Sequence, residues 1–197
     1  MASIFGHTLL GATLGKLLLP DKRYWRWWLT AAACAFLPDI DVIGFKFQVA
    51  YDSLWGHRGL THSLLAAAAL ASALTGLQQL RANPGRVVPR GRLWLLLFLA
   101  TASHGLLDGM TTGGLGVAFF SPFDTERYFL SLRPIAVSPI GVKKFVGEWA
   151  TRVLLTEALW VALPCAVVLL LQRLLRRPLA SSDAGPNGRS TSATGIN

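Results

Sequence analysis

Five apolar segments dominate the chain, and they restrict its fold more than any other feature of the sequence. They cover residues 4–19, 25–37, 60–80, 93–107 and 153–171. A helix satisfies its own backbone hydrogen bonds in lipid, and one crossing of the hydrocarbon core takes about 20 residues. The third and fifth segments meet that length, whereas the other three need their flanking residues to complete a crossing. The segments therefore predict an all-α fold, a polytopic membrane helical bundle of about four to five transmembrane helices.

The composition agrees with a membrane protein. Of the 197 residues, 52% are hydrophobic and 15% are charged, and the mean hydropathy is +0.45. A soluble domain usually carries about 25% charged residues, so this chain lacks the groups that keep a protein surface wetted. Within the first segment, Gly11 and Gly15 have the four-residue spacing that lets two membrane helices approach closely. Cys34 and Cys165 lie in apolar surroundings without a CxxC pattern and are expected to be buried thiols.

Basic residues cluster in two of the connections and after the last segment, and they give the chain a formal net charge of +9. The clusters are Lys22, Arg23 and Arg26; Arg81, Arg86, Arg90 and Arg92; and Arg173, Arg176 and Arg177. Cytoplasmic loops of membrane proteins are enriched in lysine and arginine, so these three clusters are expected to face the cytoplasm and not to bind nucleic acid. Residues 110–152 also contain basic residues, so the charge rule is only partly obeyed.

Two domains of unequal size are expected. Residues 1–177 contain all five apolar segments and are expected to form one membrane-embedded domain. Residues 178–197 are mostly small and polar, which is the composition of a disordered tail.

All four histidines of the chain and three of its aspartates lie at the ends of the apolar segments. They are His7, Asp39, Asp41, His57, His62, His104 and Asp108. If the basic clusters are cytoplasmic, the start of the first segment, the end of the second, the start of the third and the end of the fourth all face outward. In an up-and-down bundle the seven groups therefore lie at one face, the extracytoplasmic one. This topology is inferred from the positions of lysine and arginine alone, so it is independent of the seven groups.

The spacing of these residues indicates metal ligation. His104 and Asp108 are four residues apart, so on a helix their side chains share one face and can bind the same ion. His57 and His62 are five apart, which places His57 on the turn between Gly56 and Gly59, before the third helix begins.

The segment Pro38-Asp39-Ile40-Asp41 follows the second helix. Proline disfavours helix continuation, so this segment is expected to be an extended turn that aims both carboxylates at neighbouring ions. Mixed imidazole and carboxylate ligation suits Zn²⁺, with Mn²⁺ or Fe as alternatives. Seven candidate ligands indicate two or more divalent metal ions.

At these residues the chain resembles a known family, the YdjM-like predicted membrane-bound metal-dependent hydrolases. The matching motifs occur in the family's order within residues 1–125: His7-x-x-x-Gly11, Pro38-Asp39-Ile40-Asp41, the run HRGLTHS that begins at His57, His104-x-x-x-Asp108, and Pro122-Phe123. The resemblance implies a multi-pass protein of the bacterial inner membrane with a metal-dependent hydrolytic activity. A more distant similarity to zinc phospholipase C suggests phosphoester cleavage.

The leading interpretation is a metal-dependent hydrolase that acts at the membrane face on a membrane lipid or lipid-linked substrate, most simply a phosphoester. Bound metal would activate a water and polarise the scissile oxygen. Asp39 or Asp41 could accept the proton of that water, and Arg58 could hold a substrate anion.

Two other interpretations stay open. One is a structural or partner-binding membrane protein in which the metal staples four helix ends together. The other is a metal-ion transporter, which needs polar residues through the depth of the bilayer. The third and fifth segments nearly lack such residues, so transport is the least favoured of the three.

Overall fold

The computed structural model describes residues 1–80, 88–140 and 145–176. Within these ranges the protein is helical, and two isolated bridges are the sole β-type pairings. The helices are α1 (Ile4–Leu18), α2 (Trp25–Phe36), α3 (Leu64–Leu80), α4 (Arg90–Gly109), α5 (Gly147–Glu157) and α6 (Leu163–Leu175). The all-α prediction is confirmed, whereas the tail predicted at 178–197 lies outside the described residues.

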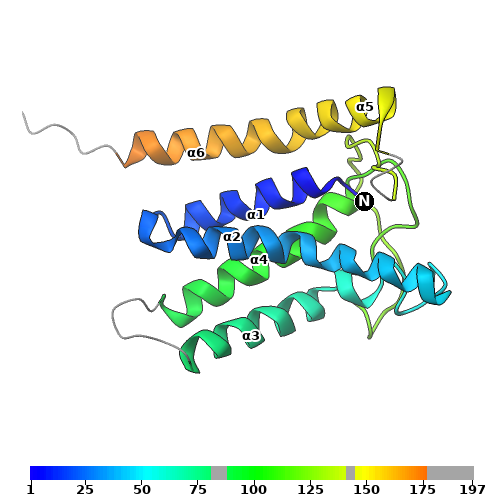
Figure 1. Cartoon of the computed structure of the whole chain (residues 1–197), viewed down its shortest axis with the longest axis horizontal. Coiled ribbons are helices and arrows are strands. Elements are labelled where there is room, and N and C mark those ends of the chain that lie inside the picture. The colour runs from blue at the N-terminus through cyan, green and yellow to red at the C-terminus, as the bar shows by residue number, and fades with distance from the viewer. Residues whose placement is uncertain (81–87, 141–144, 177–197) are drawn as a thin grey trace, which may run out of the picture.

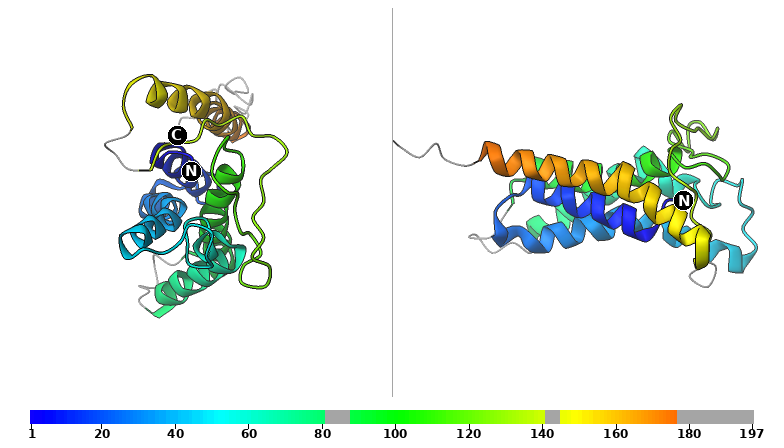
Figure 2. Two further views of the ribbon diagram at one scale, coloured as in Figure 1. Left: turned by 90° about the vertical axis from the view of Figure 1, so that its right-hand side faces the viewer. Right: turned by 90° about the horizontal axis from the view of Figure 1, so that it is seen from above.

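The helices lie side by side and alternate in direction along the bundle (Figure 1). Helix α1 packs against α2, against α4 and against residues 158–175, which include α6. Helix α3 packs against α4. Seen from the end of the bundle, α1 lies between α5–α6 on one side and α2 and α4 on the other (Figure 2). The start of α1, the start of α3 and the end of α4 therefore meet at the same end of the molecule.

Two glycines bring α1 into direct contact with the backbone of α2. A Cβ atom added at Gly11 would lie 2.6 Å from the carbonyl oxygen of Ala31, and one added at Gly15 would lie 2.7 Å from Cα of Trp28. Neither position has room for a side chain, so the packing role predicted for this glycine pair is confirmed. The close approach fixes the helix that carries His7 against the helix that leads to Asp39.

The chain after α2 stays helical instead of becoming extended. Leu37–Phe47 is a 3₁₀ helix with a proline in its first turn, so the extended turn predicted at Pro38 is wrong. Proline removes a donor that an α-helix needs but is tolerated in a first turn, where the N–H has no intrahelical partner. A 3₁₀ helix has three residues per turn, so residues i and i+2 point about 120° apart. Asp39 and Asp41 consequently face different parts of the site.

Two helical stretches are long and apolar enough to cross a membrane, Lys22–Phe47 with 26 residues and Gly147–Leu175 with 29. Ile4–Leu18 and Leu64–Leu80 are shorter apolar helices. The last stretch joins α5 to α6 through one π-helical turn, Ala158–Ala162, just before Pro164, whose missing N–H interrupts the α-helical ladder. Large apolar side chains are exposed along it, as expected of a face in contact with lipid: Leu155, Leu159, Trp160, Leu163, Val167, Leu170, Leu171 and Leu174.

Candidate metal centre

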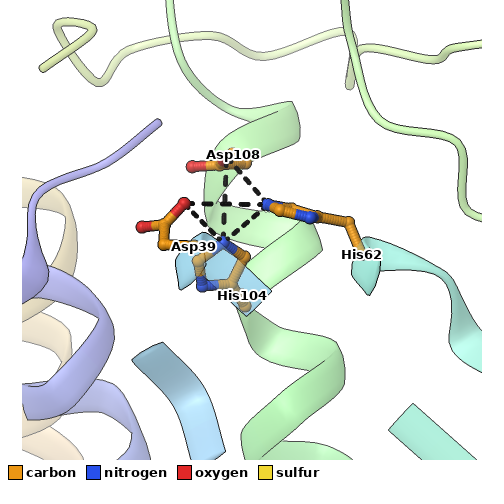
Figure 3. A group of neighbouring side chains, drawn as sticks. All are labelled: Asp39, His62, His104 and Asp108. Atoms are coloured by element: carbon orange, nitrogen blue, oxygen red, sulfur yellow. Dashed lines mark hydrogen bonds and ion pairs between the residues drawn. The ribbon is translucent and has the colours of Figure 1, made fainter. Parts of the chain in front are cut away.

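The histidines and aspartates singled out in the sequence lie together at one end of the bundle. Four of them form the centre of the cluster, and their ligand atoms all lie within 4.8 Å of one another (Figure 3): Asp39, His62, His104 and Asp108. None of the four residues is more than 4% exposed. The predicted cluster of histidines and aspartates is therefore present, and its side chains are buried inside one end of the bundle.

Helix α4 supplies His104 and Asp108 from successive turns of the same face, as their spacing predicts. Nε2 of His104 lies 3.9 Å from Oδ2 of Asp108. On the other side of the ring, Nδ1 of His104 lies 2.7 Å from the carbonyl oxygen of Ala35 in α2. Because a carbonyl oxygen can only accept, Nδ1 carries the proton, and the lone pair of Nε2 faces the cluster.

His62 ends the short 3₁₀ helix Leu60–His62 that precedes α3. Its Nδ1 lies 3.2 Å from Oδ2 of Asp41, so the carboxylate accepts a hydrogen bond from that nitrogen and Nε2 faces the centre. Nε2 of His62 and Nε2 of His104 are 2.9 Å apart. Both imidazoles therefore direct the same ring nitrogen at one point.

His7 enters the cluster from the first turns of α1. Its ring stacks on that of His104, with centroids 3.8 Å apart and an interplanar angle of 15°. The side chain is fully buried, yet neither ring nitrogen has a hydrogen-bond partner, and neither carboxylate oxygen of Asp39 has one. Buried polar atoms without partners are unfavourable. A bound cation would supply the missing partner, so the donor set fits a metal.

Asp41 lies beside the centre and is surrounded by donors. Besides His62, it accepts from His57 Nδ1 at 2.6 Å, from the hydroxyl of Thr61 at 2.6 Å and from the backbone N–H of Arg58 at 3.2 Å. Asp41, His57 and His62 are also close enough to form a second potential ligand group. The contacts give Asp41 the geometry of a carboxylate that orients two imidazoles, an arrangement common in the outer shell of metal sites.

His57 lies on the turn between Gly56 and Gly59, as the sequence predicts, and this turn depends on both glycines. A Cβ atom at Gly56 would lie 2.3 Å from the carbonyl oxygen of Ala50, and one at Gly59 would lie 2.3 Å from that of Leu54. Only glycine lets the backbone fold this tightly behind the histidine.

Arg58 is fully buried beneath the cluster. Its Nε donates to Oδ2 of Asp108 at 2.8 Å, one terminal nitrogen donates to the hydroxyl of Thr111 at 3.0 Å, and the other donates to the carbonyl oxygen of Gly113 at 2.9 Å. Arg58 thus holds a carboxylate of the centre and ties it to the loop after α4. Its predicted contact with a substrate anion stays a prediction.

The cluster carries an excess of negative charge. Three carboxylates, those of Asp39, Asp41 and Asp108, face the guanidinium of Arg58 and the N-terminal ammonium of Met1, which lies 4.0 Å from Oδ1 of Asp108. The net charge is therefore −1 when the imidazoles are neutral. Burial alone would lower the pKa of His62, but its interactions with Asp39 and Asp41 outweigh burial and raise that pKa to about 9. Without metal, His62 is therefore cationic at neutral pH. The site attracts positive charge.

Glu157, at the end of α5, is a buried residue of this region that is not among the site residues predicted from the sequence. It accepts hydrogen bonds from the backbone N–H and the hydroxyl of Ser3, the N-cap of α1. The next residue back, Ala2, donates its N–H to Oδ1 of Asp108 at 2.6 Å. The last helical stretch is thereby fixed to the segment that leads to His7. A carboxylate inside an apolar helix is itself a signal of such a role.

Comparisons with known proteins identify relatives of this chain. A family model described as "YdjM inner membrane protein" matches residues 1–178. The inner membrane protein YbcI of Escherichia coli (strain K12) is 38% identical over 157 residues, which make up 79% of this chain and 85% of that protein. No match to a solved structure was found.

Proposed function

The chain belongs to the YdjM family of inner membrane proteins, and we propose that it is a membrane-bound, metal-dependent hydrolase. The proposed substrate is a phosphoester or a lipid-linked molecule held at the membrane face. The cofactor is a divalent metal, zinc by the preference of a mixed imidazole and carboxylate set, with manganese and iron as the alternatives.

One observation carries this proposal, the convergence of His62 and His104. Their Nε2 atoms are 2.9 Å apart, while each Nδ1 faces an acceptor, Asp41 or the carbonyl oxygen of Ala35. Two neutral imidazoles in this arrangement direct lone pairs at each other, which is unfavourable unless a proton or a metal ion lies between or beside them. The adjacent carboxylates of Asp39 and Asp108 favour the metal ion, since zinc sites combine these donor types.

In the proposed hydrolysis, each residue of the cluster has a separate role. A divalent cation, when bound, would polarise the scissile oxygen and lower the pKa of an attacking water. Asp39, whose oxygens have no protein donor, serves as ligand or accepts the proton of the water. Asp41 orients His57 and His62. Arg58 holds Asp108 and, through its remaining N–H groups, contacts an anionic substrate.

The proposal includes a multi-pass topology with the site on the extracytoplasmic side. It is supported by the ends of the bundle: the connection after α1, the start of α4 and the end of α6, where most of the described basic residues lie, are opposite the cluster (Figure 1). Arg58, Arg127 and Arg133 lie at the cluster end, so the charge rule is obeyed only in part. Basic residues favour the cytoplasmic side. Five crossings follow if the two shorter apolar helices and α4 span together with the two long stretches, and four follow if one of these helices does not cross.

Metal analysis of the purified full chain, combined with a screen of lipid and phosphodiester substrates, tests the proposal. We expect bound divalent metal and metal-dependent hydrolysis. His62→Ala and Asp108→Ala should each lose metal and activity while the protein still inserts into the membrane. Normal metal content in both variants, or a wild-type protein that binds no divalent metal, would contradict the proposal.

Burial of the whole cluster favours a second candidate function, a structural metal ion that holds the helix ends together. Structural zinc sites have closed ligand shells, whereas catalytic sites keep one position open, and no ligand in the centre is more than 4% exposed. Inorganic phosphate added to Co²⁺-loaded protein separates the two candidates. An open position should shift the visible absorption bands of Co²⁺, and a closed shell should leave them unchanged.

A further inference from the structure

The two carboxylates at the heart of the cluster each face two different sets of imidazoles. Oδ1 of Asp39 lies 3.3 Å from Nε2 of His104 and 3.8 Å from Nε2 of His62, whereas its Oδ2 lies 4.0 Å from Nε2 of His7. Asp108 repeats the pattern. Its Oδ2 lies 3.8 Å and 3.9 Å from His62 and His104, and its Oδ1 lies 3.4 Å from His7. One oxygen of each carboxylate thus belongs with His62 and His104, and the other with His7.

These separations match the spacing of ligands around a metal ion. Zinc–nitrogen and zinc–oxygen bonds of about 2.0–2.2 Å place two ligand atoms of a tetrahedral site about 3.4 Å apart. The carboxylate–imidazole distances are 3.3–3.9 Å on the side of His62 and His104 and 3.4–4.0 Å on the side of His7. On both sides the imidazole–carboxylate distances therefore lie within about 0.6 Å of this spacing.

His7 has no other explanation within the described part of the protein. It is fully buried, and its two ring nitrogens have no hydrogen-bond partner. The nearest imidazole, His104, stacks flat against it, so the two rings lie parallel instead of donating to each other. An ion held by His62 and His104 alone would leave Nε2 of His7 with only its 3.4 Å contact to Oδ1 of Asp108, whereas a second ion on that side would bind Nε2 directly.

We propose that the centre holds two divalent cations side by side, with Asp39 and Asp108 bridging them. His62 and His104 bind one ion, and His7 binds the other. The first ion has four protein ligands, two imidazoles and two carboxylates, which is a complete tetrahedral set. The second has three, one imidazole and the same two carboxylates, and keeps a position open for water or substrate.

The presence of two adjacent ions narrows the class of substrate. This step rests on the hydrolase function proposed above. Two ions about 3.5–4 Å apart are the arrangement by which phosphatases and nucleases stabilise the attacking and leaving oxygens of a phosphoryl group. A phosphomonoester or phosphodiester therefore fits the centre better than a carboxylic ester or an amide. The open ion beside His7 is the one that contacts the substrate.

The experiment uses the full chain in detergent, stripped with a chelator and reloaded with Mn²⁺. We expect two Mn²⁺ ions per chain and the many-line electron paramagnetic resonance spectrum of an exchange-coupled pair. His7→Ala and the bulkier His7→Gln should each bind one ion and give the six-line spectrum of isolated Mn²⁺. Thr8→Ala, one residue along the same helix, should keep two coupled ions.

The possible results test the two-ion centre separately from the proposed hydrolase function. One ion per chain in the wild-type protein, or two ions that are not coupled, would overturn the pairing but leave a one-metal hydrolase intact. Two ions retained in both His7 variants would also overturn it. A wild-type protein that binds no Mn²⁺, Zn²⁺ or Fe²⁺ would overturn the proposed function together with the pairing.

Discussion

At the scale of single residues, the environments of Asp39 and Asp41 separate two kinds of carboxylate. Asp39 is buried, and neither of its oxygens has a hydrogen-bond partner. Asp41 accepts from the side chains of His57, Thr61 and His62 and from one backbone N–H. No protein donor competes with a metal for Asp39, whereas the donors around Asp41 include the two imidazoles that it orients.

Asp39→Asn and Asp41→Asn should therefore have different effects on metal binding. Asp39→Asn should abolish binding, because it removes a charged ligand. Asp41→Asn should keep the same number of ions per chain but weaken their affinity by about 10–100-fold, the usual cost of losing an orienting group. Metal content and affinity, measured by elemental analysis and calorimetry, check both. If Asp41→Asn lowers the stoichiometry as Asp39→Asn does, Asp41 is itself a ligand.

His62 should release a proton when the metal binds. The raised pKa of about 9 means that the metal-free protein carries a proton on this residue below that pH, and a ligating imidazole must be neutral. The apparent affinity should therefore rise about tenfold per pH unit below pH 9 for this one group and level off above it. Calorimetry in buffers of different ionisation enthalpy measures the released protons. No proton release at pH 7 would show that His62 is neutral before binding.

At the scale of secondary structure, α1 joins the parts of the site. One of its faces packs against α2 through Gly11 and Gly15, its N-cap is fixed to α5 through Ser3 and Glu157, and between them it carries His7. A shift of this helix would move His7 relative to α4. The metal centre therefore depends on backbone packing two turns away from it.

Gly11→Ala tests this dependence with the smallest possible change. The new Cβ would lie 2.6 Å from the carbonyl oxygen of Ala31, so we expect a loss of about 1–3 kcal/mol in stability through overpacking. Gly76→Ala on α3 is the matched control, since no atom lies within 4 Å of its Cβ position. It should stabilise the helix by about 0.5–1 kcal/mol. Thermal unfolding in detergent measures both, and equal effects would contradict the packing argument.

At the scale of the whole molecule, the two ends of the bundle differ in chemistry. The end with the cluster carries buried carboxylates and imidazoles together with Arg58, Arg127 and Arg133. The other end carries a larger number of basic residues, which include Lys22, Arg23, Arg90 and Arg176. The more basic end of a membrane protein favours the cytoplasm. In the orientation proposed above, the metal site therefore faces the other compartment.

Cysteine labelling tests the orientation. In a background with Cys34 and Cys165 replaced by alanine, Thr125→Cys lies in an exposed loop at the end with the cluster, and Lys22→Cys is exposed at the basic end. A membrane-impermeant maleimide added to intact cells should label Thr125→Cys and reach Lys22→Cys only after lysis. The reverse pattern would place the site in the cytoplasm.

The sequence by itself determined the helical fold and the end of the bundle at which the site lies. Apolar runs predict helices because backbone groups in lipid must bond within one segment, and alternating helix directions bring His7, Asp39, His62 and His104 to one end. The four-residue spacing of Asp108 from His104 predicts their shared face, since helical periodicity is local. These inferences need only neighbouring residues and the order of the segments.

Only the tertiary structure decided what each polar group does. Arg58 contacts Asp108 across 50 residues of sequence, and Glu157 contacts Ser3 across 154. Local pattern also failed after Pro38, where proline permits either an extended turn or the first turn of a 3₁₀ helix. The helical outcome separated Asp39 from Asp41. Hydrogen-bond partners are set by which distant segments pack together, and that choice depends on the packing of the whole bundle.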